Sequence, residues 1–171
     1  HTAGFSYNFF DDEVAKIYSK KKLFISSDTT LEEEINILSS CPLLCEPSKK
    51  WHYSVSVDVL ARIIEIVNND TLQSVLKKRI FYPLKMNDTD FIIPENKKHR
   101  LMKSYEYNPE EKKLFKPSKQ KIGLYGYPEN NLNFARGGHG LYSSLDDYSN
   151  FADMLLTGKS KSEKVILSKK I

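Results

Sequence analysis

The sequence predicts a mainly α-helical fold that carries one short β-hairpin. Apolar residues recur at helical spacing in several segments, most clearly over residues 57–67. Residues 100–115 alternate imperfectly around an Asn-Pro-Glu-Glu turn, which indicates a hairpin. Apolar residues make up 40% of the 171 positions and charged residues 28%, as in a globular unit with a core. We therefore expect residues 1–171 to form a single, mainly helical unit without internal repeats.

Two helices are expected before residue 50. Residues 8–22 have a moderately amphipathic pattern, whose inward side would consist of Phe10, Val14, Ile17 and Tyr18. The lysines at 20–22 would stabilise its C-terminal end, where the helix dipole is negative. Thr30 and Glu33 form a capping box, and Pro42 ends the short helix that follows.

The helix predicted over residues 57–67 is apolar over most of its circumference. Its polar side is reduced to a narrow stripe, made of Asp58, Arg62 and Glu65. Helices of this kind are usually buried, so we expect this one to lie inside the domain. Ser54 or Ser56 would cap its start. Tyr53 precedes it, which puts a titratable phenol at the rim of a rigid element.

Further signals follow in the second half of the chain. The stretch 70–73 caps a helix that stops before Pro83. Residues 137–140, Gly-Gly-His-Gly, predict a tight turn, because glycine adopts backbone angles that other residues avoid. Ser144 caps a last helix, and Gly158 ends it. The apolar face of this helix would consist of Leu145, Tyr148, Phe151, Ala152 and Leu155.

Composition weakens several functional classes. No run approaches the ~18 apolar residues that a membrane span needs, so no span is expected. Cys41 and Cys45 are the only cysteines, and no two histidines have ligand spacing, so we expect neither a metal site nor a disulfide framework. No targeting segment indicates a compartment.

The net charge of +4 has a local origin in residues 97–121. Aromatic side chains interleave with the basic ones there, which is a pattern that can bind nucleic acid. The acidic residues that interrupt the run are Glu106, Glu110 and Glu111. The stretch is therefore interpreted as a solvated face, and no nucleic-acid partner is expected; a basic nucleic-acid-binding module remains the alternative from a different class.

Four segments carry a family resemblance when they are taken in order. They are His-Thr-Ala-Gly-Phe at 1–5, Trp-His-Tyr-Ser-Val at 51–55, Pro-Leu-Lys-Met-Asn-Asp-Thr-Asp-Phe at 83–91, and Gly-Gly-His-Gly-Leu-Tyr-Ser-Ser at 137–144. The set resembles the serine β-lactamase and penicillin-binding-protein superfamily. The most similar branch is the class C-like one, which includes family VIII carboxylesterases and D-alanyl-D-alanine carboxypeptidases.

The resemblance implies a fold and a reaction. The chain would be the helical subdomain of the β-lactamase/transpeptidase-like α/β fold, packed against the α/β domain of a longer protein. That protein would cleave an ester, amide or β-lactam in a small-molecule or peptide substrate through an acyl-serine, without metal or cofactor. Tyr53 would be the general acid/base, its phenolate stabilised by the lysine of a Ser-x-x-Lys pair.

The Ser-x-x-Lys pair itself is expected outside this chain. The pattern occurs three times, as Ser19 with Lys22, Ser74 with Lys77, and Ser118 with Lys121. That is about as often as its serine and lysine content predicts by chance, and the family's nucleophile precedes the His-Thr-Ser-Gly turn. We expect the true pair before residue 1 and the Lys-Thr-Gly strand after residue 171, so the chain alone would be inactive.

The resemblance also nominates substrate-facing residues. His139, with its neighbour Gly138, occupies a position that lines the substrate side in the family, and Tyr7 and Asn8 follow the first turn at the rim. Val55 stands where β-lactamases usually have an asparagine that contacts the substrate amide. This favours an esterase-like or peptidase-like member. The alternative is an inactive member that binds cell-wall peptide or a protein partner.

Overall fold

The fold is mainly helical with one short hairpin, as predicted. The computed structural model describes residues 1–24, 29–103, 105–115 and 134–168. Its elements, in order, are α1 (Glu13–Lys20), α2 (Leu31–Ser39), α3 (Ser56–Asn68), α4 (Leu72–Leu76), the π-helical turn η1 (Lys77–Phe81), the 3₁₀ turn η2 (Glu95–Arg100), β1 (Glu106–Asn108), β2 (Lys113–Phe115) and α5 (Leu145–Thr157).

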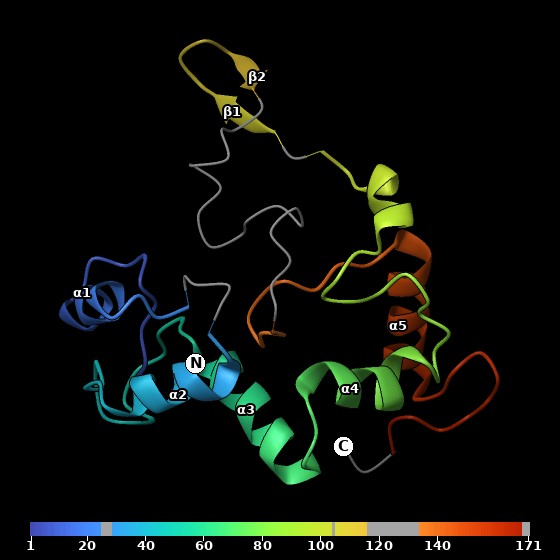
Figure 1. Cartoon of the computed structure of the whole chain (residues 1–171), viewed down its shortest axis with the longest axis horizontal. Coiled ribbons are helices and arrows are strands. Elements are labelled where there is room, and N and C mark those ends of the chain that lie inside the picture. The colour runs from blue at the N-terminus through green and yellow to red at the C-terminus, as the bar shows by residue number, and fades with distance from the viewer. Residues whose placement is uncertain (25–28, 104, 116–133, 169–171) are drawn as a thin grey trace.

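Three small hydrophobic clusters hold the helices. The first joins α1, α2 and the chain before α3, and includes Tyr18 and Leu38. The second lies between α2, α3 and α4 around Ala61, and the third joins the end of α4 and η1 to α5 around Met154. In Figure 1, α1, α2 and α3 lie on one side and α4 with α5 on the other, and residues 134–144 run between them. This segment carries the glycine turn, which lies against α3 and continues toward α5.

The local capping signals are confirmed. Thr30 Oγ1 accepts from the backbone N–H of Glu33 at 3.1 Å, and the Glu33 carboxylate accepts from the N–H of Thr30 at 2.7 Å. Thr71 and Ser144 cap α4 and α5 by accepting from the backbone N–H groups of Ser74 and Asp147. Gly158 ends α5 in a left-handed conformation with φ = 75°. These signals were readable because each involves residues within four positions of one another.

One predicted helix start and one predicted helix cap are wrong. α1 begins at Glu13 rather than residue 8, because the Asp12 carboxylate caps it by accepting from the N–H of Ala15 at 2.7 Å. No side chain caps α3, whose N-cap residue is Val55. The hydroxyls of Ser54 and Ser56 instead hydrogen-bond to each other at 2.7 Å. A serine can satisfy another side chain rather than the helix end, and the sequence pattern does not distinguish the two outcomes.

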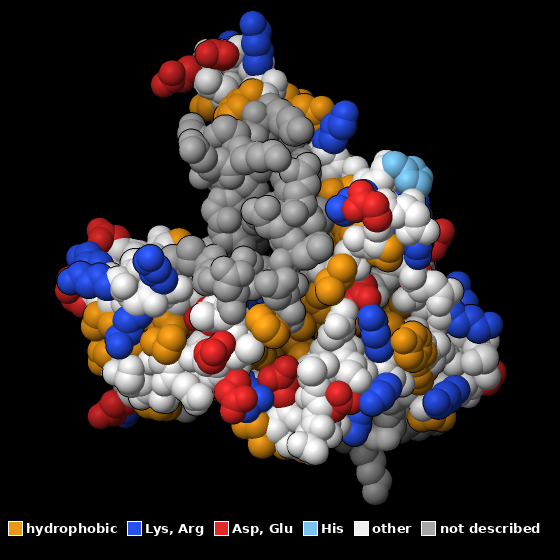
Figure 2. Space-filling model, viewed as in Figure 1, with side chains coloured by type: hydrophobic (Ala, Val, Ile, Leu, Met, Phe, Trp, Pro, Cys, Tyr) orange, Lys and Arg blue, Asp and Glu red, His pale blue; other side chains and the backbone are white. Residues whose placement is uncertain are grey.

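The prediction that α3 is buried is also wrong. Only Asp58 and Ala61 of this helix are buried, whereas Ile66 is 63% exposed and Val67 78%. Within the described residues, α2, α4 and the glycine turn cover one side of α3 and leave the other apolar side open. Figure 2 shows hydrophobic side chains at the surface of the face drawn there. An apolar helix face of this kind is suited to a further packing partner.

The inward face of α5 differs from the prediction as well. Leu145, Tyr148 and Leu155 are exposed, and Asp147 and Met154 point inward. Asp147 is held inward because its Oδ2 accepts from the N–H of Asp88 at 2.7 Å and from the Thr89 hydroxyl at 2.8 Å. A polar anchor therefore sets the rotation of this helix.

The same anchor joins two of the family-like segments. Asp90 and Tyr142 form an antiparallel bridge, with N–H to oxygen distances of 3.0 and 2.9 Å. Together with Asp147, this bridge fixes residues 83–91 beside residues 137–144. The 83–91 segment thus supports the chain that leads out of the glycine turn.

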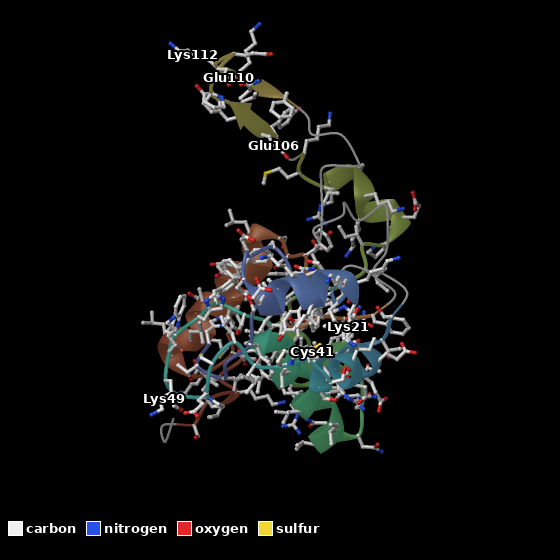
Figure 3. All side chains as sticks on the ribbon, turned by 90° about the vertical axis from the view of Figure 1, so that its left-hand side faces the viewer. Lys21, Cys41, Lys49, Glu106, Glu110 and Lys112 are labelled. Carbon is white, nitrogen blue, oxygen red and sulfur yellow. The ribbon has the colours of Figure 1, made fainter. Side chains whose placement is uncertain are left out.

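The hairpin is confirmed, with Tyr107 opposite Leu114 in an antiparallel pair. Its residues Glu106, Glu110 and Lys112 lie far from the helical body that contains Cys41 (Figure 3).

Cys41 and Cys45 are both free and half-buried.

The basic stretch before the hairpin is partly neutralised. Lys97 and Arg100 both pair with the Asp88 carboxylate, and Lys98 pairs with Glu95 at 2.6 Å. These ion pairs weaken the nucleic-acid alternative. Residues 116–121 of the stretch lie outside the described residues. In the part of the chain that the structure describes, no helix is long and apolar enough to cross a membrane.

Candidate active site

Tyr53 lies in the loop that enters α3, and its side chain is 43% exposed. The first residues of the chain hold this loop on both sides. The N–H of His52 donates to the carbonyl of His1 at 2.9 Å, and the N–H of Ser54 donates to Nδ1 of the His1 ring at 3.1 Å. The loop is fixed while the phenol remains accessible, which is the arrangement that proton transfer to a bound substrate requires.

Tyr7 connects this phenol to the glycine turn. The Tyr7 and Tyr53 rings have centroids 5.3 Å apart. A Cβ on Gly138 would lie 2.7 Å from the Tyr7 hydroxyl, so this oxygen sits directly against the turn. Three residues nominated from the sequence, Tyr53, Tyr7 and Gly138, therefore form one continuous contact.

Two other nominated residues are placed differently. Val55 is fully buried in the first hydrophobic cluster, so its side chain offers no surface to a substrate. The side-chain amide of Asn8 donates to the backbone carbonyl of Leu23 at 3.0 Å. The backbone carbonyl of Asn8 accepts from the Ser19 hydroxyl at 2.9 Å. Asn8 thus holds the end of α1 and has no described contact with Tyr53 or the glycine turn.

A residue that the sequence did not single out organises the turn. The backbone N–H groups of Gly137 and Gly138 both donate to Oδ1 of Asp58, at 3.0 and 3.1 Å. Asp58 is fully buried on α3. Gly137 must be glycine, because a Cβ there would overlap the backbone carbonyl of Val57. The sequence assigned Asp58 to a polar stripe and to the helix behind the family-like tyrosine segment. It did not nominate Asp58 for the site.

Burial tunes the charges around the turn. It raises the pKa of Asp58 above its ordinary value, and the two glycine N–H groups and the nearby His139 and Arg136 oppose that shift. Burial also lowers the pKa of His139, an effect that the Asp58 charge opposes. The His139 imidazole is therefore disposed to be neutral near pH 7 and able to both donate and accept a hydrogen bond.

The turn forms the polar end of an apolar groove of about 350 Å³ that runs along α3. Gly138 and His139 line it together with Val57, Leu60, Ile64, Leu72 and Phe91. Among the described residues, no group of three His, Cys, Asp or Glu side chains could hold a metal ion.

The serines of the two described serine–lysine pairs hydrogen-bond to other groups. The Ser74 hydroxyl donates to Asp70 at 2.8 Å, and Lys77 pairs with Asp90 at 2.6 Å. Ser19 donates to the carbonyl of Asn8. The pair Ser118 and Lys121 lies outside the described residues. Neither described pair has the serine-to-lysine hydrogen bond that would activate a nucleophile.

The mainly helical chain aligns with part of solved structures that have the β-lactamase type of fold. A hydrolase with promiscuous acyltransferase activity, EstCE1, superimposes with a TM-score of 0.75 at 24% identity, over 96% of this chain and 46% of its own. Unliganded simvastatin synthase from Aspergillus terreus superimposes with a TM-score of 0.71 at 19% identity, over 98% of this chain and 39% of its own.

A family model described as Beta-lactamase matches residues 1–169, and the chain belongs to this family. The lovastatin esterase of Penicillium rubens is 30% identical over 158 residues, which are 91% of this chain and 38% of that protein. Esterase EstB of Burkholderia gladioli is 30% identical over 100 residues, 56% of this chain and 25% of its own. The chain spans less than half the length of each of these proteins.

Proposed function

We propose that the chain supplies the helical wall and the general acid/base of a serine hydrolase, with Tyr53 as that group. The observation that carries the proposal is the accessible Tyr53 phenol, fixed by its loop and joined through Tyr7 to Gly138. The phenolate would take the proton of the nucleophilic serine and return it to the leaving group. The serine and its lysine would come from outside residues 1–171.

The open side of α3 supports this division of labour. Its exposed apolar residues, Ile63, Ile66 and Val67 among them, would be covered by the α/β domain that carries the nucleophile. Removing such a surface from water stabilises an interface by ~25 cal/mol per Å². Because that domain would come from outside residues 1–171, the apolar side of α3 is exposed here although the sequence predicts a buried helix.

The proposed substrates are esters rather than β-lactams. Val55 has no polar side-chain atom and is fully buried, so it cannot make the amide contact expected of an asparagine. Relatives at 30% identity include proteins named as esterases. The apolar groove beside the turn is suited to an acyl chain or another apolar part of a small molecule.

The substrate preference is testable with the full-length protein. We expect it to hydrolyse p-nitrophenyl butyrate with a kcat/KM at least about tenfold above that for the β-lactam nitrocefin, because a missing hydrogen bond to the amide is worth ~1–3 kcal/mol. The isolated 171-residue chain should hydrolyse neither. A preference for nitrocefin would refute the ester assignment. Hydrolysis of neither by the full-length protein would favour an inactive member that binds peptide or protein.

A further inference from the structure

We propose that Asp58 is a positioning residue, whose buried carboxylate fixes the glycine turn and thereby the substrate-facing wall at His139. The inference rests on the proposed function. Asp58 lies in the first turn of α3, five positions after Tyr53, and its N–H donates to the carbonyl of Val55 at 3.0 Å. The helix that carries Asp58 is thus continuous with the loop that carries the phenol.

The first carboxylate oxygen makes the connection across the site. Oδ1 accepts both N–H groups of the turn, although Asp58 and Gly138 are 80 positions apart in the chain. Since Gly137 also packs directly on the backbone of Val57, the turn is held on α3 both by packing and by two hydrogen bonds to one carboxylate oxygen.

The second oxygen faces the aromatic side of the site. A Cβ on Gly138 would lie 2.8 Å from Oδ2 of Asp58 and 2.7 Å from the Tyr7 hydroxyl, so both oxygens flank the same glycine. Oδ2 is buried and has no hydrogen-bond partner among the residues that the structure describes. The carboxylate therefore holds the turn by Oδ1 and leaves Oδ2 beside Gly138 and Tyr7.

This geometry predicts which property of the enzyme Asp58 controls. Gly138 and His139 form one end of the apolar groove, whereas Tyr53 is held by the N-terminal residues. A displacement of the turn would therefore change the shape of the groove more than it changes the position of the Tyr53 phenol. Loss of the carboxylate should therefore impair substrates that occupy the groove more than substrates too small to reach it.

The test compares Asp58→Ala and Asp58→Asn in the full-length protein with two esters. For Asp58→Ala, the kcat/KM for p-nitrophenyl octanoate should fall at least about tenfold more than that for p-nitrophenyl acetate, mainly through KM. Asn keeps an acceptor oxygen for the two N–H groups. In Asp58→Asn, the ratio of kcat/KM for octanoate to that for acetate should therefore stay close to the wild-type ratio. Glu65→Ala is the matched control, because Glu65 is a carboxylate of the same helix that accepts from the N–H of Leu72 at 3.0 Å.

Hydrogen exchange gives a readout that does not depend on activity. Asp58→Ala should speed amide exchange at residues 137–138 by at least about tenfold, and Asp58→Asn and Glu65→Ala should not. Unchanged exchange in Asp58→Ala would overturn the positioning role, as would equal losses for both esters in an active enzyme. An inactive wild-type protein in which Asp58→Ala still speeds exchange would refute the proposed function and retain the positioning role.

Discussion

Replacing Tyr53 by Phe in the full-length protein is expected to lower kcat/KM for ester hydrolysis by about 10²–10⁴-fold, the usual contribution of a positioned general acid/base. The free energy of unfolding should change by less than ~0.5 kcal/mol, because the phenol is 43% exposed and its ring contacts with Tyr7 and His1 are retained by Phe. Steady-state kinetics and urea unfolding measure the two quantities.

A matched control is Tyr148→Phe, which removes a hydroxyl from an exposed tyrosine on α5. It should leave both quantities unchanged. Retention of more than about a tenth of the activity in Tyr53→Phe would exclude Tyr53 as the proton-transfer group.

The largest effect on stability is expected from Glu34→Ala, which should lower the free energy of unfolding by about 3–5 kcal/mol. Glu34 and Arg136 form an ion pair at 3.4 Å, and their side chains are 1% and 2% exposed. Glu34 also accepts from the N–H of Phe24 at 2.9 Å and from the Thr29 hydroxyl at 2.6 Å. The substitution removes the carboxylate that faces a buried guanidinium directly before the glycine turn. Urea unfolding of the full-length protein measures the loss.

Glu32→Ala provides the comparison on the same helix. Glu32 pairs with Arg62 at 2.6 Å, but its side chain is 59% exposed. Exposed ion pairs contribute ~0–1 kcal/mol, so this variant should be close to wild type. Equal losses of unfolding free energy in the two variants would show that the buried ion pair stabilises the protein no more than the exposed one.

The parts of the structure that could be predicted from sequence are those with local signals. The capping box at Thr30, the hairpin turn at 108–111 and the glycine that ends α5 each depend on residues a few positions apart. The family-like segments, in their order, indicated that Tyr53, Tyr7 and Gly138 belong to one site. Tyr7 does lie against both Tyr53 and Gly138, and their shared role in a site stays a prediction.

The parts that could not be predicted depend on distant residues. Apolar periodicity indicates that α3 and α5 have apolar sides, but it does not state which side finds a partner. In α5 the rotation is set by Asp147, which binds the backbone of Asp88, 59 positions away. Arg136 and Glu34 are 102 positions apart. Such pairs leave no pattern in a single sequence, so Asp58 was assigned only to the narrow polar stripe of α3 and not to the site.

The measurement that tests the central claim most directly is mass-spectrometric mapping of the full-length protein after reaction with a fluorophosphonate. The claim is that Tyr53 transfers protons for a serine contributed by another part of the protein. It predicts one adduct, on a serine outside residues 1–171 that has a lysine three positions later, and slower labelling in Tyr53→Phe. An adduct on a serine within residues 1–171, or ester hydrolysis without any serine adduct, would contradict it.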